Sequence, residues 1–188
     1  MALFVHGKDN TLPLQSVKIQ SKSGKTLYFR LMEIMLLCVG KSSGAELNEM
    51  IADYKTRLSR YVKFSMPIVP AVKPTKSQSS ELHTLKEAAL LEKQIAKTDT
   101  VVLLDEKGSQ QTSKQLAETL QTKMNLGTRR LIFVVGEPYG FSETFRKKYP
   151  QKIAFSRMTF SHQMIRLFFC EQLYRAFTIL NNHPYHNN

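Results

Sequence analysis

The stretch Leu131-Ile-Phe-Val-Val-Gly136 decides the fold class of this chain. Consecutive apolar residues that are rich in β-branched side chains and stop at a glycine are typical of a strand buried on both faces of a parallel sheet. Two further runs share this character: Met32-Glu-Ile-Met-Leu-Leu-Cys-Val39, which stops at Gly40, and Val101-Val-Leu-Leu104, which stops at Asp105. The three runs predict the central strands of one sheet.

The segments around these runs have helical spacing. Over residues 45–63 apolar side chains recur at steps of three and four, which predicts an amphipathic helix. A second helix is expected from about residue 80, capped by Ser80, with an inward face made of Leu82, Leu85, Ala88, Ala89 and Ile95. The other expected elements are an edge strand over 64–72, a short strand over 153–155, and helices over 113–124, 142–149 and 161–180. This alternation predicts an α/β fold, a parallel sheet with helices on both faces.

Composition narrows the class of protein. The chain of 188 residues can bury the core of one domain, and its formal net charge of +12 indicates a polyanionic partner, because Lys and Arg neutralise phosphates. Cys38 and Cys170 each lie in an apolar run and are expected to be buried free thiols, as suits a reducing compartment. No Cys/His cluster has metal-ligand spacing, and no apolar run approaches the roughly 18 residues of a membrane span. We therefore expect a cytoplasmic protein with no metal site and no membrane partner.

Three loops are candidates for a ligand site, because ligands of open parallel sheets bind beyond the carboxyl ends of the strands. They cover residues 104–108, 136–142 and 155–160. By its pattern alone the second loop is a plain Gly/Pro turn. It lacks the glycine-rich fingerprints of dinucleotide and nucleoside triphosphate sites, which argues against those ligands.

The chain end, Asn181-Asn-His-Pro-Tyr-His186, gathers two histidines and a tyrosine. Two interpretations of this pattern stay open: a frayed terminus, or a lid of base-stacking and hydrogen-bonding groups. Glu171 and Arg175 lie four residues apart on the expected last helix, and this spacing alone indicates a structural ion pair.

Several short motifs follow one another in a fixed order, and together they resemble one family. They are Phe133-Val-Val-Gly136, Gly140-Phe-Ser142, Ser156-Arg-Met-Thr-Phe-Ser-His162, Glu171-Gln-Leu-Tyr-Arg-Ala-Phe177 and His183-Pro-Tyr-His186. With the run from Met32 to Lys41 and the pair Leu104-Asp105, they resemble the ribosomal RNA large subunit methyltransferase H family, which belongs to the SPOUT superfamily of knotted methyltransferases. The resemblance spans residues 32–188. Any one motif is weak, but five in register that end at the chain terminus are specific.

The resemblance implies a C-terminal deep trefoil knot, a rare exception to the rule that chains are not knotted. It implies S-adenosyl-L-methionine as the cofactor, held bent against the knot in a dry pocket that aligns the methyl group for attack. By position, the implied cofactor contacts are Leu104, Gly136, Phe155, Ser156, Arg157, Met158, Thr159 and Phe160. It also implies a homodimer, whose interface would include the last helix with Leu167, Phe168, Tyr174 and Phe177; burial in the helix's own domain explains the same stripe equally well.

The implied reaction is methylation of ring nitrogen N3 of a pseudouridine in large-subunit ribosomal RNA, within the assembled ribosome. Since that nitrogen is a poor nucleophile while protonated, catalysis needs proton removal or stabilisation of the developing anion. We expect His186 and Tyr185 to position the substrate or handle the proton, and Arg175 to orient the tail or stabilise negative charge.

Two residues depart from the family pattern. Glu137 follows Gly136 where the family usually has a second glycine, and Asn187 follows the final histidine where the family usually has Lys or Arg. The first departure keeps open an alternative, a non-catalytic ribosome-binding protein of the same fold. A second alternative is a SPOUT methyltransferase that acts on transfer RNA or on another ribosomal position.

The expected domain organisation places a knotted methyltransferase domain at residues 32–188, and residues 1–31 form an N-terminal extension. Met32 is a plausible original start. Two interpretations of the extension stay open: a disordered basic arm, or an artefact of an upstream start.

Overall fold

The computed structural model describes residues 16–20, 26–30, 32–41, 44–73, 79–136 and 138–185. The chain divides into two compact units, residues 1–31 and residues 32–188. In the first unit, β1 (Ser16–Gln20) pairs with β2 (Thr26–Arg30) in an antiparallel ladder that sets Val17 opposite Phe29.

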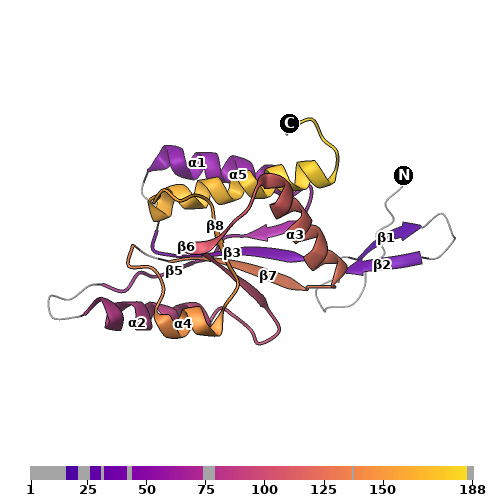
Figure 1. The fold of residues 1–188 in the computed structure, drawn as a ribbon. Coiled ribbons are helices and arrows are strands. Elements are labelled where there is room, and N and C mark those ends of the chain that lie inside the picture. Colours follow the sequence, from indigo (N-terminus) through magenta and orange to yellow (C-terminus); the bar gives the residue numbers. More distant parts are fainter. Residues whose placement is uncertain are drawn as a thin grey trace, which may run out of the picture. The chain divides into compact units, whose positions relative to one another are not determined.

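The second unit is built on a parallel sheet with the strand order β4-β3-β7-β6-β8, and β5 pairs with β3 beyond the end of β4 (Figure 1). The three apolar runs form its centre, as the sequence predicts, because strands covered on both faces need apolar side chains in both directions. The strands are β3 (Glu33–Val39), β4 (Lys63–Ser65), β5 (Ile68–Val69), β6 (Thr100–Gln110), β7 (Arg130–Val135) and β8 (Lys152–Ala154).

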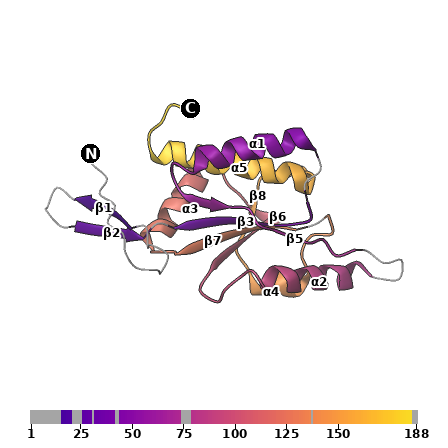
Figure 2. The ribbon, with the colours of Figure 1, turned by 180° about the vertical axis from the view of Figure 1, so that it is seen from behind.

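Helices cover both faces of this sheet, which confirms the predicted parallel α/β architecture. On one face lie α1 (Ala45–Leu58), α3 (Ser113–Asn125) and α5 (His162–Leu180); on the other lie α2 (Ser80–Glu92) and α4 (Glu143–Lys148) (Figures 1 and 2). Successive side chains of β7 point to opposite faces of the sheet and so contribute to both cores. Phe133 packs with α3 and α5, whereas Ile132 and Val134 pack with α2 and α4. Cys38 and Cys170 are buried free thiols, as expected.

Three predicted element boundaries are wrong. Helix α1 ends at Leu58, five residues before the predicted end, and the expected strand over 64–72 is split into β4 and β5. Pro67 stands in the gap between these strands, and a proline has no N–H to donate to a sheet. The cap of α2 is Ser79 rather than Ser80, and its Oγ accepts the backbone N–H of Leu82.

The predicted inward face of α2 is wrong in part. Ala88 is buried and Ile95 packs against the core, as predicted, but Leu82, Leu85 and Ala89 are exposed. In their place the helix buries His83, Thr84, Glu87 and Leu91. Burial of the polar pair is tolerable because Nε2 of His83 lies 3.1 Å from Oε1 of Glu87, although Nδ1 of His83 is buried without a partner among the described residues. Apolar spacing alone could not reveal this compensation.

Strand β6 departs most from the prediction, since it continues to Gln110 where a loop was expected over 104–108. Its ladder with β8 shifts register: Leu104 and Ser109 both pair with Ile153. Between these pairings the chain passes so close to β8 that a Cβ on Gly108 would lie 2.6 Å from backbone atoms of Ile153. Only a glycine fits this approach.

Candidate active site

The expected ligand loops meet at one edge of the sheet. Leu104 pairs with Val135 on β7 and with Ile153 on β8, so it lies between the strand ends that lead into Gly136 and Phe155. Gly136 packs under Phe141, whose ring would lie 3.2 Å from an added Cβ. The structure therefore brings together residues from all three predicted loops.

Beside this edge lies a pocket of about 660 Å³, which we call the α3–α5 pocket. The start of α3 forms one wall, the segment after β8 forms a second, and the middle of α5 forms the third. Its lining residues are Gln111, Thr112, Ser113, Lys114, Phe155, Ser156, Phe160, Phe168, Glu171 and Gln172. Aromatic rings thus face amide, hydroxyl and carboxylate groups, a mixture that is common in sites for small organic groups.

Glu171 is the hydrogen-bonding centre of this pocket. Its Oε1 accepts from Nε of Arg175 at 2.9 Å and from the hydroxyl of Tyr185 at 3.4 Å, and its Oε2 accepts from Nε2 of Gln172 at 2.6 Å. Gln172 is held in turn, because its Oε1 accepts from Oγ of Ser113 at 2.7 Å. A chain of hydrogen bonds therefore runs from the first residue of α3 to the tail.

Tyr185 packs on the same group of side chains. The guanidinium of Arg175 lies 4.8 Å from the centre of its ring, within the range of a cation–π contact, and its hydroxyl lies 3.3 Å from that of Tyr54. Burial, the hydrogen bond with Tyr54 and the charge of Glu171 raise the pKa of Tyr185 above its usual value. The phenol is therefore neutral near pH 7 and acts as a hydrogen-bond donor.

Of the predicted cofactor residues, Phe155, Ser156 and Phe160 line the α3–α5 pocket. Ser156 shapes the segment, since its Oγ accepts the backbone N–H of Met158 at 2.9 Å. Phe160 packs edge-on against Phe168, with ring centres 5.0 Å apart. Arg157, Met158 and Thr159 are exposed and are not among the residues that line the pocket.

Of the predicted catalytic residues, Arg175 and Tyr185 are brought together through Glu171, and His186 lies outside the described residues. The two departures from the family pattern, Glu137 and Asn187, also lie outside them. Sequence reasoning missed the wall made by Gln111–Lys114. A signal for it was present, because Thr112 and Gln115 form a capping box that starts α3 beyond the carboxyl end of β6.

A part-buried ion pair holds the middle of β6 near the site. Oδ2 of Asp105 accepts from Nε of Arg146 at 2.7 Å, and its Oδ1 accepts the backbone N–H of Lys107. Burial acts to raise the pKa of this carboxyl, but the hydrogen bonds from Arg146 and Lys107 outweigh it and hold the pKa below its usual value. The pair joins α4 to the segment that approaches β8.

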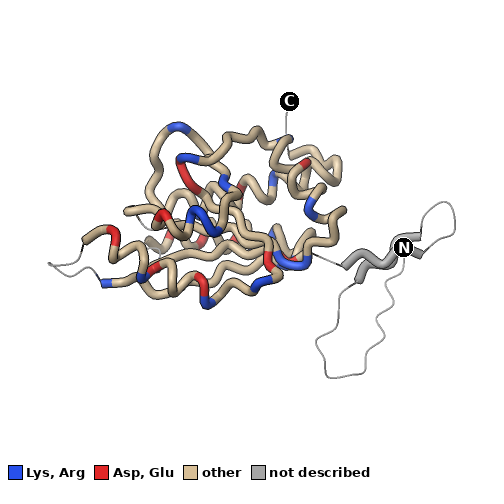
Figure 3. Tube along the Cα trace, turned by 60° about the horizontal axis from the view of Figure 1, so that its bottom comes forward, with Lys and Arg blue, Asp and Glu red and all other residues tan. Residues whose placement is uncertain are grey.

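Three general features of the described residues bear on the kind of ligand and on the surroundings of the protein. Lys and Arg are spread over many elements rather than gathered on one (Figure 3). Within the described ranges, no group of three or more His, Cys, Asp or Glu side chains could hold a metal ion. No helix in this part of the chain is long and apolar enough to cross a membrane.

Comparison with known proteins defines the class. A family model described as a predicted SPOUT methyltransferase matches residues 32–186, which is most of the chain. Among solved structures, the tRNA (m1G37) methyltransferase from Aquifex aeolicus aligns with a TM-score of 0.51 at 11% identity, over 84% of this chain and 75% of that one. At this identity the likeness concerns the fold alone.

Closer relatives give the particular family. Ribosomal RNA large subunit methyltransferase H of Christiangramia forsetii is 51% identical over 156 residues, which cover 83% of this chain and 99% of that protein. The proteins of the same name from Flavobacterium johnsoniae and Parabacteroides distasonis are each 49% identical over the same length. The chain belongs to the ribosomal RNA large subunit methyltransferase H family of SPOUT methyltransferases, which confirms the resemblance seen in its motifs.

Proposed function

We propose that this protein transfers a methyl group from S-adenosyl-L-methionine to N3 of a pseudouridine in large-subunit ribosomal RNA, on assembled ribosomes in the cytoplasm. One observation carries the proposal: the α3–α5 pocket joins the segment with the implied cofactor contacts to the carboxylate of Glu171 with its partners Arg175 and Tyr185. The names of the relatives, which match over almost their full length, supply the ribosomal substrate.

The residues present fit the cofactor. A volume of about 660 Å³ lies within the usual range for small-molecule sites, and the rings of Phe155, Phe160 and Phe168 offer apolar surface at its rim. We assign the cofactor contacts to Leu104, Gly136 and residues 155–160, where the ends of β6, β7 and β8 meet. When bound, the cofactor supplies an electrophilic methyl group on its sulfonium.

The side chains on α5 are suited to the proton on N3. A carboxylate has about four acceptor positions, two on each oxygen. Oε1 of Glu171 accepts from both Nε and Nη2 of Arg175 and from Tyr185, whereas Oε2 accepts only from Gln172 among the described residues. We assign the remaining position on Oε2 to the N3 proton of the base, so that Glu171 orients or receives it while Arg175 stabilises the negative charge that develops. Tyr185, a neutral donor, and His186 position the base.

The fold supports a threaded C-terminus. We propose that residues 32–188 form a trefoil knot, because Leu104 and Ser109, on either side of the segment 105–108, both pair with Ile153 of β8 and Gly108 lies against the same residue. We also propose a homodimer. Leu167 and Phe177 are buried in their own domain, so an interface would use the less buried side of α5, including Phe168 and the exposed Met164.

The test uses ribosomes from a strain that lacks the gene. The purified full chain should add one methyl group in the presence of S-adenosyl-L-methionine, and nuclease digestion with mass spectrometry should identify N3-methylpseudouridine. Glu171→Gln, which keeps the shape but removes the charge, should bind the cofactor in calorimetry and lose most of the transfer. Methylation of a different nucleoside would refute the proposed target, and absence of cofactor binding would favour the non-catalytic ribosome-binding alternative.

A further inference from the structure

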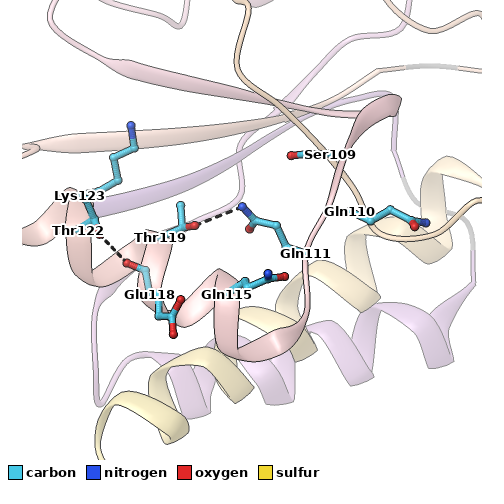
Figure 4. Close-up of a pocket in the computed structure, with 8 residues that line it drawn as sticks. All are labelled: Ser109, Gln110, Gln111, Gln115, Glu118, Thr119, Thr122 and Lys123. Carbon is cyan, nitrogen blue, oxygen red and sulfur yellow. Dashed lines mark hydrogen bonds between the residues drawn. The ribbon is translucent and has the colours of Figure 1, made fainter.

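A second hollow, which the proposed chemistry does not use, opens beside the α3–α5 pocket. It has a volume of about 510 Å³ and lies between one side of α3 and the end of β6 (Figure 4). We call it the α3 groove and define it by Ser109, Gln110, Gln111, Gln115, Glu118, Thr119, Thr122 and Lys123. Every side chain in this set is polar, which argues against an apolar peptide or a lipid and favours a ligand rich in hydrogen-bonding groups.

The groove and the α3–α5 pocket share one residue, Gln111. Its Nε2 donates to Oγ1 of Thr119 at 3.2 Å (Figure 4). Its Oε1 is buried and has no hydrogen-bond partner among the described residues. A buried acceptor without a partner is costly, so a bound ligand gains free energy if the Gln111 amide turns and brings Oε1 to one of its donors. The two hollows therefore meet at an amide whose acceptor is unsatisfied.

The two charged residues of the α3 groove lie at different places along it, so its two parts favour different chemical groups. Glu118 and Thr119 lie in its middle, and Lys123 lies at the end of α3 away from Gln111. A carboxylate repels phosphate but accepts hydrogen bonds from base amino and imino groups, whereas an ammonium attracts phosphate. Nζ of Lys123 lies 3.1 Å from Oε1 of Gln151 in an exposed contact, which a phosphate could replace.

The length of the groove suits a strand rather than a single small molecule. From Gln115 to Lys123 a helix advances by roughly 12 Å, and the rise per nucleotide in a stacked strand is only about 3.4 Å. A strand whose target base lies in the α3–α5 pocket would pass Gln111 and continue along α3.

We infer that the α3 groove binds the RNA nucleotides next to the methylated base, with Gln111 and Thr119 contacting a base edge or ribose and Lys123 contacting a phosphate. This inference rests on the proposed function, since it assumes that the target base enters the α3–α5 pocket. Hydroxyl and amide side chains of this kind read sugars and base edges, and they contribute to the recognition of single-stranded RNA.

The test compares Thr119→Val and Lys123→Ala with the wild-type protein on ribosomes that lack the modification. Both variants should raise the KM for ribosomes about tenfold, leave kcat within twofold and leave cofactor affinity in calorimetry unchanged. Lys123→Ala should also reduce the slope of log KM against log salt by about one, as the loss of one phosphate contact requires, and Thr119→Val should not. Gln121→Ala, an exposed change on the same helix outside the groove, is the matched control.

Wild-type KM and salt dependence in both variants would overturn the inference. So would a shift from dimer to monomer in sedimentation, because the groove would then be covered by a second copy of the chain. Ribosome binding measured by co-sedimentation separates this test from that of the proposed function. If the wild type binds ribosomes without transferring a methyl group, the proposed reaction fails, and weaker binding of both groove variants still supports the groove.

Discussion

Replacing Gln172 by leucine tests the hydrogen-bond chain that holds Glu171. Leucine keeps a branched side chain of similar bulk but cannot donate to Oε2 of Glu171, a bond of 2.6 Å in the wild type. A hydrogen bond to a charged group contributes about 1.5–3 kcal/mol. If that free energy holds the carboxylate toward the base in the transition state, its loss slows methyl transfer about 10- to 150-fold, since about 1.36 kcal/mol corresponds to a factor of ten.

A second substitution in the same hydrogen-bond chain should slow methyl transfer by a smaller factor. Ser113→Ala removes only the bond of 2.7 Å that steadies Gln172, and a neutral hydrogen bond contributes about 0.5–1.5 kcal/mol. We therefore expect a decrease of about 2- to 10-fold, smaller than that of Gln172→Leu.

The assay is single-turnover methyl transfer to ribosomes at saturating cofactor, from pH 6 to 9, with Gln121→Leu as a matched control on the exposed side of α3. Cofactor affinity and the melting temperature should match those of the wild type. A rate within twofold of wild type for Gln172→Leu would refute the reasoning. A slower rate that tracks a lower melting temperature would show that Gln172 acts only on the fold.

Three further predictions concern stability and reactivity. Gly108→Ala should lower the free energy of unfolding in urea by more than about 2 kcal/mol, because its Cβ would meet the backbone of Ile153 at 2.6 Å. Gly127→Ala, where there is open space but a φ of +71°, should lower it by about 1–2 kcal/mol. Equal losses in the two variants would argue against a close approach of Gly108 to β8. Arg146→Met should lower the free energy of unfolding at pH 7 by about 3 kcal/mol, because it leaves the carboxylate of Asp105 without its partner. The folded pKa of Asp105 lies below its unfolded value, so the advantage of the wild type should be present above about pH 4 and disappear as the pH falls through the folded pKa. A difference that persists unchanged at pH 2 would contradict this role of the carboxylate. Cys38 and Cys170, whose pKa burial raises to about 12, should react with a thiol reagent at pH 8 only when the protein unfolds, and fast labelling of the native protein would disprove their burial.

The sheet was predictable because the sequences of its central strands are continuous apolar runs. No polar residue interrupts Leu131–Val135 or Ile34–Val39, so these strands are stable when both of their faces are buried. By contrast, the continuation of β6 to Gln110 consists of polar residues without alternation, and its structure depends on pairing with β8. The inward face of α2 was missed for a related reason, since His83 and Glu87 satisfy each other only after the helix has formed.

The site was predictable only in pieces. Glu171 and Arg175 have the spacing of an ordinary surface ion pair, and nothing local to α5 distinguishes them from one. Their distinction comes from Gln172, which is held by Ser113 on another helix, and from Tyr185, which returns from the tail to the same carboxylate. Contacts between residues so far apart in sequence are set by the tertiary structure, and motif resemblance pointed to the residues without giving these contacts.

The double pairing of β6 with Ile153 has a consequence for how the protein is made. Strands β3, β6 and β7 pair with one another without any residue beyond Val135, so the centre of the sheet can form before β8 has been synthesised. Leu104 and Ser109 both pair with Ile153, so the end of β6 gains its partner only when β8 arrives. The region that carries Glu171 and Tyr185 is therefore completed after the central strands.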